Sequence, residues 1–182
     1  EFFGTGGGRY GKGNIFKHSQ NTLYPHDPAQ HPIKDNSTGK TIAYGSDNKG
    51  GGYIISRAAQ NNVGTQNHRR TFIASYDEKS GAEAVYIIID KSDNGKYWQM
   101  CALEDVKISN HKDGFLMSGK GGATLKGTSL YHQGPLKVTH GIRKRGSAAK
   151  WKNQIIKNNS FVHMQSSDGN HLVVLTISKN GK

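Results

Sequence analysis

Two apolar runs in the middle of the chain give its clearest pattern of hydrophobic positions. The first run is Ala84 to Asp90, the second is Tyr97 to Leu103, and the triplet Asp93-Asn94-Gly95 lies between them. Because Asn and Gly tolerate positive φ, the triplet predicts a tight hairpin in which residue numbers that sum to about 188 face each other. Neither run alternates strictly with polar residues, so both faces would be apolar. The pattern predicts a central, buried β-hairpin.

Weaker patterns flank this hairpin and predict further strands. Short strand candidates are residues 53–55, 71–74, 115–117 and 128–131. Phe161 to Gln165 and Leu172 to Ile177 predict a second hairpin around the turn residues Asp168-Gly169.

Residues 147–157 are the best helix candidate in the chain. Ser147 is a suitable N-cap, and Ala148, Trp151 and Ile155 recur at i, i+3 and i+7 to give one apolar stripe. We therefore predict an α+β fold that is mostly a curved antiparallel β-sheet, with the central buried hairpin and one or two short helices.

Length and composition indicate a single domain with a modest core. The chain has 182 residues, of which 33% are apolar and 24 are glycine. Such a composition favours many turns over a helical bundle. We expect one nucleic-acid-binding domain over residues 1–182, with a loop-rich N-terminal region (1–52), core strands (53–110) and a basic region (111–182).

The sequence carries no pattern that calls for a membrane or an oxidising compartment. No apolar run approaches the roughly 20 residues that span a bilayer. The N-terminal residues also lack the pattern of a signal peptide. The single cysteine, Cys101, lies in an apolar run and is expected to be a small buried side chain. We expect a cytoplasmic protein, unless a signal has been removed, and leave its oligomeric state open.

Charge is the feature that points to a partner. The chain carries a net charge of +12, and between Asp113 and Asp168 it has nine Lys and Arg residues and no acidic residue. A concentrated positive field attracts polyanions, and nucleic acid is the commonest of them in cells. The alternatives are another polyanion, an acidic protein partner, or a surface whose charge serves only solubility. The residues expected to bind DNA or RNA are Arg69, Arg70, Lys120, Lys126, Arg143, Lys144, Arg145, Lys150 and Lys152.

Acidic residues around the predicted hairpin suggest a metal-dependent site. In the expected register Glu83 lies opposite Asp105, and opposed carboxylates repel each other unless a cation lies between them. Lys107 is close enough to polarise an attacking water beside a bound Mg²⁺. Glu83, Asp105 and Lys107 are therefore candidate catalytic residues, with Glu83 and Asp105 as metal ligands. The alternative is a solvated strand end at which Lys107 neutralises the acids.

His140 offers a metal-free route to the same chemistry. It precedes the basic run Arg143-Lys144-Arg145, where an imidazole could act as general base or acid beside cations that hold a phosphate. His163 and His171 would project from opposite faces of the second predicted hairpin, which disfavours a joint site.

These features together predict a nucleic-acid-binding protein that is an endonuclease, of restriction or toxin type, cleaving DNA or RNA. The first alternative is a non-catalytic DNA-binding or specificity module of a larger protein. The second is a protein that binds acidic polypeptides.

Overall fold

The structure is a computed structural model that describes residues 22–26, 39–57, 65–151 and 154–179. For residues 144–151 and 154–157 it describes the backbone alone. The described chain is made of antiparallel β-strands with one short 3₁₀ turn, η2 (Glu78–Ser80), and it contains no α-helix. No helix in these ranges is long and apolar enough to cross a membrane.

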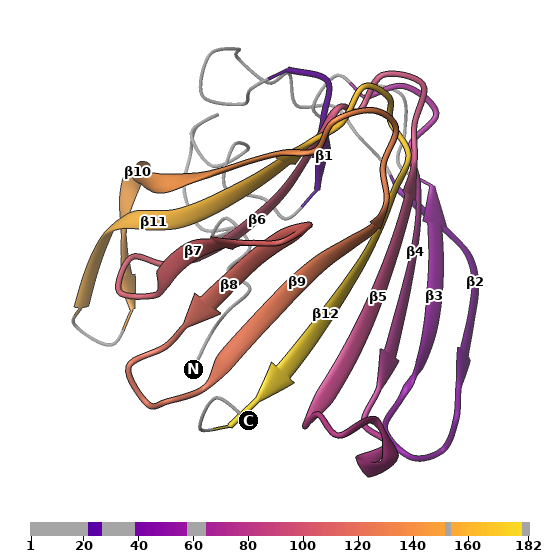
Figure 1. Cartoon of the computed structure of the whole chain (residues 1–182), viewed down its shortest axis with the longest axis horizontal. Helices are drawn as coiled ribbons and strands as arrows, with labels where there is room; N and C mark the ends of the chain where they lie inside the picture. The colour runs from indigo at the N-terminus through magenta and orange to yellow at the C-terminus, as the bar shows by residue number, and fades with distance from the viewer. Residues whose placement is uncertain (1–21, 27–38, 58–64, 152–153, 180–182) are drawn as a thin grey trace.

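The described strands form two sheets that face each other as layers (Figure 1). The larger sheet has the order β2 (Lys40–Ser46), β3 (Gly52–Arg57), β4 (Arg69–Ser75), β5 (Ala84–Lys91), β12 (His171–Ser178), β9 (Thr124–Tyr131), β8 (Gly114–Ser118) and β7 (Lys107–His111). The smaller sheet has the order β1 (Leu23–Tyr24), β6 (Tyr97–Leu103), β11 (Gln154–Gln165) and β10 (Lys137–Trp151). The last strand, β12, lies between β5 and β9 and joins the two halves of the larger sheet.

The hydrophobic core lies between the two sheets. Trp98 and Met100 of β6 alternate with residues that face the other way, and they pack toward Phe115 of β8. The centres of the Trp98 and Phe115 rings are 6.1 Å apart, so the two rings are in contact across the two layers. Other buried core side chains are Ile88, Ala102, Met117, Leu125, Val162, Met164, Val173 and Leu175.

Phe115 depends on a glycine in the neighbouring strand. Gly127 of β9 is its direct partner in the register, and a Cβ at that position would overlap the Phe115 ring. The same arrangement recurs where Tyr53 pairs with Gly45, and the glycines let the aromatic rings lie close to the adjacent backbone.

The predicted α+β fold class is wrong, because the described fold is entirely β. Within the predicted helix 147–157, the described residues 147–151 and 154–157 belong instead to β10 and β11, which pair with each other from Lys137–Gln165 to Trp151–Gln154. Three apolar positions at helical spacing are a weak signal over one short segment, and pairing with a long neighbouring strand satisfies the same backbone groups.

The predicted central hairpin is also wrong, although its two strands are real. β5 pairs with β4 and β12 in the larger sheet, whereas β6 pairs with β1 and β11 in the smaller one. The connection between them therefore crosses from one layer to the other. The Asn94 side chain accepts a hydrogen bond from the Gln66 amide at 2.8 Å, which holds the turn against another loop. The second predicted hairpin fails in the same way, since β11 and β12 lie in different sheets.

Candidate functional site

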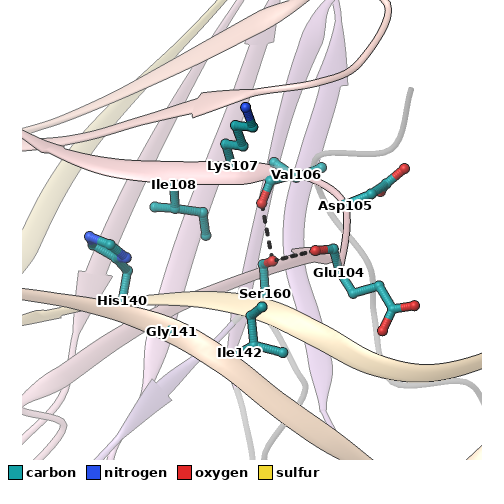
Figure 2. A pocket seen from close by; sticks show the side chains of 9 residues that line it. All are labelled: Glu104, Asp105, Val106, Lys107, Ile108, His140, Gly141, Ile142 and Ser160. Carbon is teal, nitrogen blue, oxygen red and sulfur yellow. Dashed lines mark hydrogen bonds between the residues drawn. The ribbon is translucent and has the colours of Figure 1, made fainter.

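A pocket lies between two edge strands, one from each sheet. β7 is an edge strand of the larger sheet and β10 is an edge strand of the smaller one. The pocket has a volume of about 410 Å³ and is lined by Glu104, Asp105, Val106, Lys107, Ile108, His140, Gly141, Ile142 and Ser160 (Figure 2).

A tight turn and one serine fix the pocket's acidic side. The Val106 amide donates to the Leu103 carbonyl at 3.1 Å, which closes the turn between β6 and β7. The Ser160 hydroxyl lies within hydrogen-bonding distance of the Val106 carbonyl at 3.1 Å and the Glu104 carbonyl at 3.4 Å. β11 thereby anchors the segment that carries the two carboxylates.

His140 reaches the pocket because of the strand register. Its pairing partner in β11 is Val162, a buried core residue, so His140 is on the side of β10 that faces the larger sheet. At the rim of the layers this side is open, and the imidazole is exposed. Figure 2 shows the imidazole on one side of the pocket and the Glu104 and Asp105 carboxylates on the other, with Ile108 and Ile142 between them.

The pocket joins three of the four predicted catalytic residues, His140, Lys107 and Asp105. Asp105 also forms an exposed ion pair with Lys120, with its Oδ2 3.5 Å from the Nζ. The Lys107 side chain itself projects from the other face of β7, because Ile108, which pairs with the buried Met117, takes the inner face (Figure 2). An imidazole and nearby carboxylates beside an apolar floor can bind a polar ligand and move a proton to or from it. Asp105 and Lys107 were placed together by their proximity in the sequence, but no sequence signal connected them with His140.

The fourth residue, Glu83, does not join the pocket. It precedes β5, and its Oε2 lies 3.9 Å from the Nζ of Lys179. β5 and β7 are four strand positions apart in the larger sheet, about 19 Å at ordinary strand spacing. The expected Glu83–Asp105 opposition depended on the hairpin that does not form. Among the residues that the structure describes, no group of three or more His, Cys, Asp or Glu side chains could hold a metal ion.

The basic residues of the predicted nucleic-acid surface are divided between the two sheets. Lys126 is exposed on the outer face of β9, in the larger sheet. Arg143 lies on the outer face of the smaller sheet, where its guanidinium carbon is 4.3 Å from the centre of the Phe161 ring and Nη1 donates to Gln99 at 3.3 Å. The side chains of Lys144, Arg145 and Lys150 and the whole of Lys152 lie outside the described residues. The described members of the set therefore do not share one face.

Arg69 and Arg70 point to opposite sides of β4. Arg69 is exposed, whereas Arg70 lies on the core side and binds the buried Asp90 through two hydrogen bonds, of 2.8 Å from Nε and 2.7 Å from Nη2. His68 donates to the same carboxylate at 2.8 Å. Arg70 therefore supports the fold and is not part of an open binding surface.

This Asp90 cluster was not predicted from the sequence. Burial alone would raise the pKa of Asp90, but the charge of Arg70 and the hydrogen bonds from His68 and Arg70 outweigh it and hold the pKa well below its ordinary value. His171, paired with Asp90 in the ladder, is buried, and this burial lowers its pKa despite the nearby acids. The only sequence signal was an aspartate at the end of an otherwise apolar run.

Comparison with known proteins supports the architecture and leaves the family open. No family model and no curated protein sequence matches the chain. A mutant of the heparan sulfate lyase HepC from Pedobacter heparinus has a similar structure, with a TM-score of 0.60, 13% identity, and coverage of 98% of this chain and 28% of the lyase. A heparinase III matches with a TM-score of 0.62, 11% identity, and coverage of 97% of this chain and 27% of the enzyme. The chain thus spans about a quarter of the length of these lyases.

Proposed function

We propose that this chain binds acidic polysaccharides, as the β-sandwich domain of a larger polysaccharide-degrading protein. The observation that carries the proposal is the fold: 97–98% of the chain superimposes on about a quarter of heparan sulfate lyases. Heparan sulfate is a linear polyanion, and the chain's net charge of +12 suits such a ligand. The proposal keeps the polyanion partner indicated by the sequence and changes its chemical class.

Binding to heparan sulfate tests this function. We expect the purified chain to bind heparan sulfate at low ionic strength, with an affinity that falls steeply as salt rises, because cations that neutralise a polyanion release its counterions. Titration calorimetry at several salt concentrations measures both quantities. Neutral dextran is the control, and equal binding of dextran and heparan sulfate, or binding of neither, would contradict the proposal.

Nuclease activity is a second candidate, favoured by the presence of both His140 and Asp105 in the lining of one pocket. Here His140 is the general base or acid, and Asp105 contributes to a Mg²⁺ site or orients water. Lys107, which projects from the other face of β7, would have to turn around the strand edge to stabilise charge on the scissile phosphate. A non-catalytic DNA-binding module remains the weaker form of the same proposal.

Incubation with plasmid DNA and total RNA, each with Mg²⁺ or EDTA, tests the nuclease candidate. If the chain cleaves either polymer, His140→Gln should lower the rate by roughly 10²–10⁴-fold, since this is the usual contribution of a general acid or base. His111→Gln is the matched control, because His111 is exposed at the end of β7 and outside the pocket. Absence of cleavage in every condition would remove this candidate, and cleavage that persists in EDTA would remove a Mg²⁺ role for Asp105.

A further inference from the structure

Four cations stand in one row across neighbouring strands of the larger sheet. The register pairs Lys40 of β2 with Arg57 of β3, Arg57 with Arg69 of β4, and Arg69 with Lys91 of β5. All four residues are exposed. We refer to Lys40, Arg57, Arg69 and Lys91 as the cation row. It lies at one end of strands β2–β5, which form the right-hand side of the larger sheet in Figure 1.

The cation row faces solvent on the outer side of the sheet. Arg70 and Asp90, next to Arg69 and Lys91 along their strands, are paired with each other on the core side. Since side chains alternate along a strand, Arg69 and Lys91 project outward, and their register partners share that face.

No acidic residue in the described part of the chain forms an ion pair with the cation row. The one side-chain hydrogen bond found there is long: Arg57 Nη2 donates to Asn67 Oδ1 at 3.5 Å. Like charges directly opposite each other on a sheet are destabilising, and here three successive pairs are alike. An external anion bound at the cation row would relieve this repulsion, so its binding would be favoured.

We infer that the cation row is a docking line for a linear acidic polysaccharide. The class of ligand rests on the proposed function, whereas the row itself is read from the strand register. The row extends over three inter-strand spacings, about 14 Å between its outermost Cα atoms, so it can follow one extended chain. Arg57 and Arg69 suit the planar, bidentate recognition of carboxylate and sulfate groups.

The neighbouring row on the same face explains why a polysaccharide is favoured over duplex nucleic acid. The next outward positions along the four strands are Ala43, Ile55, Thr71 and Ile89, and none is charged. A single line of charge beside an uncharged, mostly apolar row matches a sugar chain, whose rings carry charged groups at the edge and C–H bonds on the face. A duplex presents phosphates on two strands across a groove and would call for a second line of cations.

The row is separate from the pocket that contains His140. The pocket lies at β7, on the opposite edge of the larger sheet from β2. A polysaccharide held at the row would thus be bound without occupying the pocket.

An Arg57→Gln/Arg69→Gln double variant tests the inference. It should bind heparan sulfate about tenfold more weakly than the native chain, with a shallower dependence on salt, because two exposed ionic contacts are lost. A Lys49→Gln/Lys112→Gln variant is the matched control: it removes the same charge from exposed turn residues and should bind like the native chain. Thermal unfolding adds a second readout, since the row variant should be at least as stable as the control at low salt.

The possible outcomes separate the two proposals. If the row variant and the control bind heparan sulfate equally, the row is not the docking line, while the proposed function stands. If the native chain does not bind heparan sulfate, the proposed function is wrong as well. If the row variant loses affinity for duplex DNA but keeps its affinity for heparan sulfate, the row serves nucleic acid and the inference is overturned.

Discussion

An Asp90→Asn variant should have a free energy of unfolding about 3–5 kcal/mol below that of the native protein. The substitution keeps the size of the side chain and removes its charge. Arg70, only 20% exposed, would then keep a buried positive charge without its partner. His68 would also lose the ionised acceptor that it now contacts at 2.8 Å. Urea unfolding at neutral pH, followed by far-ultraviolet circular dichroism, measures the loss.

Asp113→Asn is the matched control for this prediction. Asp113 is exposed in the turn between β7 and β8 and has a φ of 57°, a conformation that Asn tolerates well. Its unfolding free energy should stay within about 0.5 kcal/mol of the native value. An Asp90→Asn protein as stable as this control would show that the buried cluster contributes little to the fold.

A Phe115→Ala variant should lose about 3–5 kcal/mol of unfolding free energy, because it opens a cavity between the layers. Phe115 is fully buried, and its ring lies between Trp98 of the smaller sheet and the backbone of Gly127. Chemical denaturation of the variant beside the native protein measures the effect.

Gly127→Ala provides an internal check on that prediction. In the native protein the added methyl group would overlap the Phe115 ring, and overpacking of this kind costs about 1–3 kcal/mol. In the Phe115→Ala background the ring is gone, so the same change should be nearly neutral. A double-mutant cycle measures the difference, and additive effects of the two changes would contradict the contact.

Strand positions were predictable from the sequence, but sheet membership was not. The runs at residues 84–90 and 97–103 coincide with β5 and β6, because local alternation and β-branched content are properties of each segment alone. Which strands pair depends on contacts between distant parts of the chain. Asn94 looked like a hairpin residue, yet its side chain binds the amide of Gln66, 28 positions away.

The residues of the candidate site were likewise predictable only where they are close in the sequence. Lys107 and Asp105 share the pocket because they are close in sequence, whereas Glu83 is excluded because its predicted opposition came from the wrong hairpin. The cation row was invisible to a search for acid-free segments, since acidic residues lie between Arg69 and Lys91. Only the register of four strands brings those charges together.

The position of β12 affects how the protein is made. Until this segment leaves the ribosome, β2–β5 and β7–β9 can form only two separate meanders, with β5 and β9 as unpaired edges. Insertion of the last strand covers both edges at once, so closure of the larger sheet follows synthesis of nearly the whole described chain. From the synthesis of β9 until that of β12, the nascent chain therefore carries two unpaired strand edges that could pair with other chains.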